Sequence, residues 1–245
     1  MTRSARQGSP GGLRVAVLIP ALNEEDALPV QLRRIPGWVD RVVVVDNGST
    51  DGTVALARSA GAEVVHEAER GYGAACLRGI RHLANQGRPP EVLAFLDADG
   101  SDDPGLLADL VAPLVAEGGG ARAGLVLGVR QSVGGHVGTI LPHARFGNRL
   151  VLGLTALLFG RRFADLPPFR AISFQALQSL EMDDRTWGWT LQMQIRALRA
   201  GLAIVEQGMP HADRVAGESK ISGSLGISVR VGLKMLWTLI RERLR

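Results

Sequence analysis

Cysteine is almost absent from this chain of 245 residues, because Cys76 is the one cysteine in it. An internal disulfide is therefore excluded, which fits a reducing compartment. Aromatic residues make up only 4% of the sequence. RNA-binding surfaces commonly interleave basic and aromatic side chains, and the sequence contains no such segment. We therefore expect no nucleic-acid partner.

Long hydrophobic runs are also missing. A membrane-spanning helix needs about 20 apolar residues, whereas Val151–Gly160 is too short and Val231–Ile240 is interrupted by Lys234. Residues 1–12 are polar and small, so we expect a disordered N-terminal tail and no signal peptide. The sequence predicts a cytoplasmic protein without a transmembrane segment, with peripheral contact at the cytoplasmic membrane face as an open alternative.

Positive charge is in mild excess and unevenly placed. The formal net charge is +4 and the isoelectric point is about 10.1. The notable carboxylates lie in the first hundred residues, while arginines cluster in the second half. A basic second half favours an anionic partner such as an acidic lipid or a phosphorylated substrate.

Short apolar, β-rich runs alternate with helical segments through the first half of the chain. This order predicts an α/β fold in one domain (residues 13–226), with a mainly parallel sheet covered by helices on both faces. We expect Asn23 to cap the first helix and an amphipathic basic helix over residues 227–245. The expected strands are Val15–Ile19, Val42–Val45, Ala62–Val65, Val92–Leu96, Leu125–Val129 and a short Ala203–Val205.

Polar side chains follow the first four of these strands. In an open α/β sheet, ligands bind outside the carboxyl ends of the strands. One crevice is therefore expected to collect Pro20 to Glu24, Asp46, His66 to Arg70, and Asp97 with Asp99.

The pair Asp97 and Asp99 is the sharpest of these features. Alternate residues of an extended chain point the same way, so both carboxylates face one site. A divalent cation such as Mg²⁺ or Mn²⁺ relieves their repulsion and takes such oxygen ligands together with substrate phosphates. The alternative is a solvated acidic turn that caps the next helix.

The segment Asp46–Thr53 supports a ligand site at the same edge. A strand-end aspartate can accept hydrogen bonds from a ribose or a base edge, and the glycines permit a tight turn with close ligand approach. The alternative is a turn in which Asp46 only satisfies backbone amides.

These motifs together resemble a known family. IPALNEE, VVVVDNGSTDGT, ERGYGAACLRGI and FLDADGSDDP stand in the order and spacing of the family 2 glycosyltransferases, which have the GT-A fold with its Rossmann-like sheet. The chain is most similar to the branch of dolichyl-phosphate mannose synthases and polyprenyl-phosphate glycosyltransferases. LGVRQSVGG, RFGN, DLPPFRAI and RVAGESKISG extend the resemblance, which runs from Val15 to Lys234.

The resemblance implies inverting, metal-dependent transfer of a sugar from a UDP- or GDP-sugar to a polyprenyl phosphate. It assigns Asp99 to the Mg²⁺ or Mn²⁺ ion, with Asp97 as a further metal ligand. Asp165 is a candidate base or positioning group. The nucleotide pocket would be lined by Pro20, Glu24, Asp46, Arg70, Gly71 and Asp97. The donor diphosphate or acceptor phosphate would be met by Arg130, Arg145, Arg170 and Lys220.

The chain also departs from the family's pattern. Asn47 replaces a frequent aspartate, Asp102 stands where a histidine is usual, and Gln192 stands where an acid is often found. Glutamine cannot act as a base, which fits a phosphate acceptor, already ionised at neutral pH, better than a sugar hydroxyl. A soluble hydroxyl acceptor and a nucleotide-binding protein without transfer activity stay as alternatives. A nicotinamide dehydrogenase is disfavoured because no G-x-G-x-x-G follows the first strand.

Overall fold

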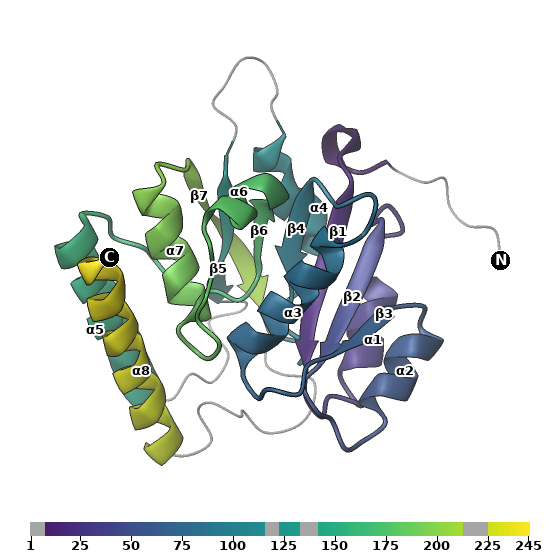
Figure 1. Cartoon of the computed structure of the whole chain (residues 1–245), viewed down its shortest axis with the longest axis horizontal. Helices are drawn as coiled ribbons and strands as arrows, with labels where there is room; N and C mark the ends of the chain where they lie inside the picture. The colour runs from purple at the N-terminus through teal and green to yellow at the C-terminus, as the bar shows by residue number, and fades with distance from the viewer. Residues whose placement is uncertain (1–7, 116–122, 133–141, 213–224) are drawn as a thin grey trace.

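A seven-stranded sheet forms the centre of the molecule (Figure 1). The structure is a computed structural model, and it describes residues 8–115, 123–132, 142–212 and 225–245. All strands run in one direction except β6, which is antiparallel to both of its neighbours. The predicted mainly parallel α/β fold is therefore confirmed. The strands, in spatial order, are β3 (Glu63–His66), β2 (Arg41–Asp46), β1 (Val15–Ala21), β4 (Val92–Phe95), β6 (Arg170–Ser173), β5 (Leu125–Ser132) and β7 (Ile204–His211).

The direction of winding changes between β1 and β4. From β1 the chain proceeds outward through β2 and β3 on one side, while β4 pairs with the opposite edge of β1. Such a reversal is the place where ligands bind in open α/β sheets. Two features of this sheet differ from the sequence-based expectation, since β6 was not anticipated and β7 continues to His211 instead of ending near Val205.

Apolar side chains alternate along β1 and thereby supply both faces of the sheet. Ala16 and Leu18 belong to the core cluster on one face, and Val15, Val17 and Ile19 belong to the cluster on the other. The first face is covered by α3 (Tyr72–Ala84), α6 (Phe174–Ser179) and α7 (Trp189–Arg199). The second face is covered by α1 (Leu28–Arg34), α2 (Thr53–Ser59) and α4 (Leu107–Val111).

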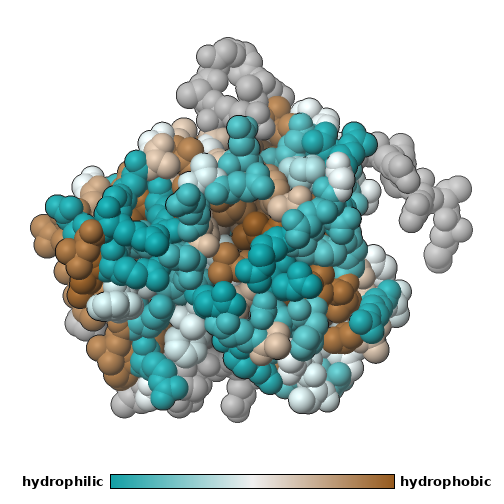
Figure 2. All heavy atoms as spheres, viewed as in Figure 1, coloured by the Kyte–Doolittle hydropathy of each residue, from teal (hydrophilic) through white to brown (hydrophobic). Residues whose placement is uncertain are grey.

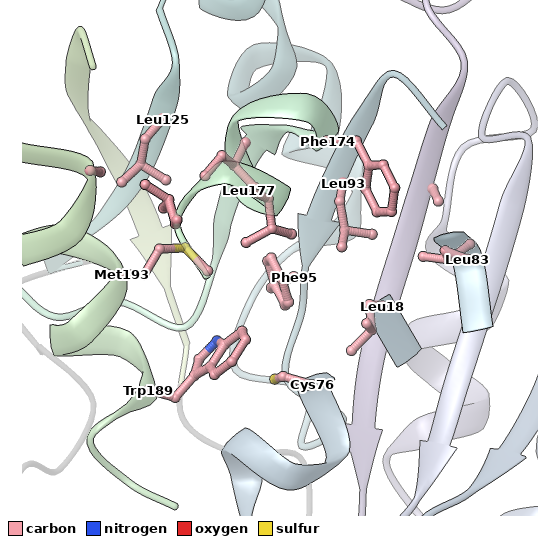
Figure 3. Close-up of a cluster of buried hydrophobic side chains, with 14 of the residues drawn as sticks. Leu18, Cys76, Leu83, Leu93, Phe95, Leu125, Phe174, Leu177, Trp189 and Met193 are labelled. Atoms are coloured by element: carbon pink, nitrogen blue, oxygen red, sulfur yellow. The ribbon is translucent and has the colours of Figure 1, made fainter. Parts of the chain in front are cut away.

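The core beneath α3 and α7 contains the largest buried aromatic pair. The rings of Phe95 and Trp189 lie 6.3 Å apart between centroids and are tilted by 59°, a favourable geometry for aromatic contact. Cys76 of α3 is fully buried in the same cluster (Figure 3). This core holds α3 and α7 against β4, and both helices begin near the carboxyl edge of the sheet (Figure 1).

Two long helices form a further layer beyond α7. The helices α5 (Pro142–Phe159) and α8 (Leu225–Leu244) lie side by side at the margin of the molecule (Figure 1). They enclose a small third cluster, which consists of Val151, Leu166, Leu191, Ile195 and Leu239. Among the helices within the described ranges, none is long and apolar enough to cross a bilayer.

Several local expectations need correction. Asn23 does not cap a helix, because it has a positive φ of 51° and α1 begins only at Leu28. Its side chain instead accepts a hydrogen bond from the amide of Thr50 at 2.8 Å. Within the tail expected over residues 1–12, Pro10–Gly12 form a 3-10 turn, whereas residues 1–7 lie outside the described residues. Asp103 caps the 3-10 turn Pro104–Leu106, because its carboxylate accepts a hydrogen bond from the amide of Gly105 at 2.8 Å.

Candidate active site

The polar residues predicted at strand ends come together at one edge of the sheet. The register pairs Ala21 of β1 with Asp46 of β2, and Asp46 with His66 of β3. On the other side of β1, β4 ends at Phe95, and Asp97 follows two residues later. The carboxyl ends of β5 and β7 and the amino end of β6 lie at the same edge because of the strand directions.

Asp46 is held tightly by its own loop. Its carboxylate is only 5% exposed and accepts hydrogen bonds from the amides of Ser49 (2.9 Å) and Gly48 (3.3 Å), and it lies 3.0 Å from Nδ1 of His66. Burial acts to raise the pKa of Asp46, but these hydrogen bonds outweigh it and the pKa lies below its usual value. Asp46 is thus an ionised carboxylate that orders the turn, as the turn interpretation of the sequence requires.

Asn47 organises the neighbouring loop, a role that the sequence analysis missed. Its side-chain amide donates to the carbonyl oxygens of Glu67 (3.0 Å) and Glu69 (2.7 Å), and its carbonyl accepts from the amide of Gly71 (2.8 Å). An aspartate could not make the two donations, because an ionised carboxylate only accepts. The arrangement explains how Asn47 serves here in place of the more frequent acid.

Arg70 and Gly71 border this corner of the sheet edge. The guanidinium of Arg70 donates to the carbonyl oxygen of Gly48 at 3.0 Å. Gly71 has a φ of 149° and leads into α3, and a Cβ there would collide with the carbonyl oxygen of Arg185. Pro20 is the second-last residue of β1. In the loop that follows, the amide of Glu24 donates a hydrogen bond to Oγ1 of Thr53 at 2.8 Å.

Asp97 and Asp99 lie directly beyond β4. Asp99 is 8% exposed, and its Oδ1 accepts hydrogen bonds from the amide (2.9 Å) and hydroxyl (2.6 Å) of Ser101. Burial raises the pKa of Tyr72 well above its usual value, and the charge of Asp97 adds to that rise. The backbone carbonyl of Asp97 accepts a hydrogen bond from the side chain of Gln31 in α1 at 3.4 Å.

A third acid, Asp102, follows this pair and was not anticipated as part of the site. It is 4% exposed and lies 3.3 Å from Nδ1 of His211, at the end of β7. Burial raises the pKa of Asp102; the hydrogen bond and charge of His211 oppose the rise, and the charge of Asp99 adds to it. The extension of β7 to His211 is what brings the two residues together.

The donor set at this place fits a divalent cation that is shared with a substrate. Within the described residues, no three His, Cys, Asp or Glu side chains stand close enough to hold a metal ion by themselves. Mg²⁺ sites that use one or two carboxylates, water and substrate phosphates need no such cluster. Oδ2 of Asp102 is also buried without a hydrogen-bond partner among the described residues, so an unused oxygen lies next to Asp99.

Arg130 and Asp165 form a bidentate ion pair. Nε and Nη2 of Arg130 donate to the two carboxylate oxygens of Asp165, each at 2.7 Å, and both side chains are largely buried. Burial acts to raise the pKa of Asp165, but the hydrogen bond and charge of Arg130 lower it below the usual value. A carboxylate of lowered pKa is a weak proton acceptor, so this geometry favours the positioning role of Asp165 over the basic one.

Arg170 is a buried cation that is bonded to backbone carbonyl groups. It is 1% exposed at the start of β6, and its guanidinium donates to the carbonyl oxygens of Pro167 and Thr190. Burial lowers the pKa of Arg170 to about 10. The side chain thus ties the loop before β6 to the start of α7, and its expected role toward a phosphate stays a prediction.

Gln192 does not face the site, which corrects an inference drawn from the sequence. It is fully buried, accepts from the amides of Asp183 (3.1 Å) and Asp184 (2.9 Å), and donates to Oδ1 of Asp183 and Oε1 of Glu242, both at 2.7 Å. Its amide is needed for this network, since it both donates and accepts. The residue type at this position therefore carries no information about the acceptor.

Two predicted cations are not placed by these contacts. Arg145 lies near the start of α5, with its side chain outside the description, and Lys220 lies outside the described residues. The roles assigned to the individual site residues stay predictions.

The sequence and the fold of this chain are both similar to those of known proteins. Residues 16–185 match the family model of Glycosyl transferase family 2. An uncharacterized glycosyltransferase of Mycobacterium tuberculosis is 36% identical over 94% of this chain and 99% of its own length. Undecaprenyl-phosphate mannosyltransferase of Micrococcus luteus is 33% identical over 95% of this chain and 99% of its own. Polyprenol monophosphomannose synthase of Mycolicibacterium smegmatis is 33% identical over 86% and 82%, respectively.

Among solved structures, the fold is similar to glucosyl-3-phosphoglycerate synthase from Mycobacterium tuberculosis. The complex of that enzyme with Mn²⁺, uridine diphosphate and phosphoglyceric acid superposes with a TM-score of 0.73 and 25% identity. The match covers 95% of this chain and 79% of that one.

Proposed function

Because this chain belongs to glycosyl transferase family 2, and is therefore a glycosyltransferase, we propose that it transfers a sugar from a UDP- or GDP-sugar to a polyprenyl phosphate. The observation that carries the proposal is the position of Asp46, Asp97 and Asp99 beyond the carboxyl ends of β2 and β4, on either side of β1, at the switch point where open α/β sheets bind ligands. The transfer is a single inverting displacement, with Mg²⁺ or Mn²⁺ as the cofactor.

The donor is held by the loops beyond β1, β2 and β4. The ordered turn after Asp46 and the Arg70–Gly71 segment form the nucleoside side of the site, and Asp97 adjoins it across the switch point. Asp99 is the metal ligand, with Asp97 beside it. When bound there, the cation supplies positive charge opposite the leaving nucleoside diphosphate. Mn²⁺ is present together with uridine diphosphate in the glucosyl-3-phosphoglycerate synthase complex, and this supports the assignment of a divalent cation.

The residues near Arg130 are suited to an acceptor that is already ionised. A phosphate monoester has a second pKa of about 6 and is largely dianionic at neutral pH, so it can attack without a strong base. Arg130 and Asp165 keep each other ionised in their ion pair, and this pair is a fixed charge arrangement rather than a proton acceptor. Orientation of the lipid phosphate then supplies much of the acceleration.

The names and coverage of the relatives support the lipid acceptor. The two named relatives that act on polyprenyl lipids are 33% identical to this chain over most of its length. The structural neighbour bound to phosphoglyceric acid, a soluble compound, is 25% identical.

A soluble hydroxyl acceptor is the second candidate, and one observation favours it. Asp102 has a raised pKa and lies beside His211 and Asp99. The pair of Asp102 and His211 could therefore accept the proton of a hydroxyl acceptor. The two candidates differ in whether transfer requires a phosphate on the acceptor.

The decisive experiment is a transfer assay on the purified full-length chain. A panel of UDP- and GDP-sugars is offered with Mn²⁺ or Mg²⁺, with either a short water-soluble polyprenyl phosphate or the matching polyprenol, and products are identified by mass spectrometry. We expect a metal-dependent polyprenyl phosphosugar and no product from the alcohol. Product from phosphoglyceric acid, with none from the polyprenyl phosphate, would assign the soluble acceptor instead.

The metal ligand is tested by Asp99→Asn, with Asp109→Asn as the matched control on the exposed side of α4. Asparagine keeps an oxygen to accept the hydrogen bonds of Ser101, so we expect the fold to be kept. Transfer should fall about a hundredfold or more, because a metal ion supplies several kcal/mol of transition-state stabilisation. Binding of Mn²⁺ in the presence of nucleoside diphosphate, followed by calorimetry, should weaken in Asp99→Asn alone. Unchanged Mn²⁺ binding would remove Asp99 from the metal site.

A further inference from the structure

Exposed hydrophobic side chains are confined to one part of the described chain. Every large apolar side chain that is exposed there lies on α5 or α8. We call this set the outer apolar face; it consists of Leu150, Leu157, Leu158, Val229, Leu233, Trp237, Ile240 and Leu244. Figure 2 shows hydrophobic residues gathered along the left side of the molecule, where Figure 1 places both helices. A contiguous apolar patch of this kind marks a contact surface on a water-soluble fold.

The spacing along α8 makes one continuous stripe. Val229, Leu233, Trp237, Ile240 and Leu244 follow one another at intervals of four, four, three and four residues, which is the repeat of one helix face. On α5, Leu150 and Leu157 are seven residues apart and also share a face. Both helices therefore turn an apolar stripe outward.

The opposite side of α8 is fastened to the domain. Lys234 forms an ion pair of 2.9 Å with the buried Asp184, and Glu242 is 1% exposed and accepts hydrogen bonds from Arg196 at 2.8 and 2.9 Å. Leu239 packs into the cluster shared with α5 and α7. The outer apolar face is thus carried on helices that are fixed to the domain, and within the described residues its side chains are left exposed.

The charges around this face have one sign. Arg149, Arg230 and Arg243 are exposed on the two helices. In the described part of α5 and α8 the one carboxylate is Glu242, which is buried and paired. A hollow of about 350 Å³ on α5 is lined by Arg149, Leu152, Gly153, Ala156 and Arg162. Two arginines, Arg149 of α5 and Arg162 just beyond that helix, thus border this hollow.

We propose that the outer apolar face of α5 and α8 docks on the surface of an anionic membrane. Amphipathic helices with an apolar stripe, a Trp residue and flanking cations lie in the plane of a bilayer interface in this way. A second copy of the chain is a poorer occupant, because its equivalent face would set arginine against arginine without an exposed carboxylate to pair with. The proposal rests on the proposed function in that a polyprenyl phosphate acceptor resides in such a membrane.

Vesicle flotation of the full-length chain tests the docking without donor or acceptor. Vesicles of phosphatidylcholine alone are compared with vesicles that also contain phosphatidylglycerol. We expect binding to the anionic vesicles and little to the neutral ones. Leu233→Ser/Trp237→Ser removes apolar contact, and Arg230→Glu/Arg243→Glu reverses two exposed charges. Each pair should weaken binding by about tenfold or more, whereas the control Arg58→Glu, an exposed arginine of α2, should bind as the wild type does.

A positional readout accompanies flotation. Brominated lipids should quench part of the tryptophan fluorescence of the wild type, and this part should be missing in Trp237→Phe. Circular dichroism and thermal melting verify that all variants keep the fold, which we expect because the changed side chains are exposed.

Transfer to the short water-soluble polyprenyl phosphate, measured without vesicles, separates this proposal from the proposed function. We expect the docking variants to keep wild-type turnover in that assay. An active wild type that does not bind anionic vesicles, or a charge-reversed variant that binds them unchanged, overturns the docking proposal while the proposed function stands. A dimer of the wild type that Leu233→Ser/Trp237→Ser dissociates, with no vesicle binding, would assign the face to a second copy and also overturn it. Vesicle binding without transfer to any polyprenyl phosphate supports docking and counts against the proposed function.

Discussion

Replacement of Gly73 by alanine is expected to loosen the joint between α3 and the segment that precedes α7. Gly73 is buried in the first turn of α3, and a Cβ there would overlap the carbonyl oxygen of Asp184 and lie 2.9 Å from the carbonyl carbon of Arg185. Both obstacles are backbone atoms, which cannot rotate away. The two segments are joined by hydrogen bonds from the amides of Gly73 to Thr186 (3.3 Å) and of Ala74 to Arg185 (2.8 Å).

The magnitude follows from three contributions. Overpacking in a well-packed interior costs about 1–3 kcal/mol. Loss of the two hydrogen bonds costs about 1 kcal/mol each. Alanine returns about 1 kcal/mol through its higher helix propensity. The net loss in the free energy of unfolding is therefore about 2–4 kcal/mol, or a fall in Tm of roughly 5–15 °C for a chain of this size.

The assay is thermal and chemical unfolding of Gly73→Ala beside a matched control. Gly232→Ala is suitable, because Gly232 lies within α8 and a Cβ there has open space around it; it should leave stability unchanged or raise it slightly. Since Gly71 and Arg70 immediately precede the joint, Gly73→Ala should also lower kcat/KM for the donor by about tenfold or more. Equal stability of the two variants would refute the argument from backbone contact.

Two further substitutions examine the buried polar networks. Gln192→Glu places a carboxylate 2.7 Å from oxygens of Glu242 and Asp183, so unfolding should become easier by about 3 kcal/mol without any gain in transfer rate; a more active variant would restore Gln192 to the site. Asp165→Asn leaves the buried Arg130 without its partner and should cost about 3 kcal/mol at pH 7. The folded-state pKa of Asp165 is lowered, so its contribution is present above the unfolded pKa of about 4 and is lost as the pH falls through the folded value. The stability of Asp165→Asn should thus fall less steeply in acid than that of the wild type, and parallel pH profiles would contradict the assignment.

The parallel part of the fold was readable from local pattern. Alternating apolar residues such as those of Val15–Ile19 supply both faces of a sheet, and the β-α order leaves few topologies open. Strand β6 was not readable, because Arg170–Ser173 is only four residues long and is defined by pairing with β4 and β5, which are distant in sequence. The insertion of β6 between β4 and β5 depends on contacts between segments far apart in the sequence, which no local pattern specifies.

Some residues of the candidate site could likewise be placed from the sequence, and others could not. Asp46, Asp97 and Asp99 could be placed from the sequence because a residue that ends a parallel strand has its position set by the strand itself, and the family membership and fold that their motifs predicted are confirmed. The pairing of Asp102 with His211 depends on how far β7 extends, and the burial of Arg170 depends on the packing of the loop before β6 against α7.

By itself, the sequence determined the class of fold, the order of the strands along the chain and the edge at which the acids gather. Period and strand ends are local properties, so a short window of residues is enough to specify them. Only the tertiary structure decided that Gln192 is a buried link and that the stripes of α5 and α8 face outward, because both depend on which distant segments cover a side chain.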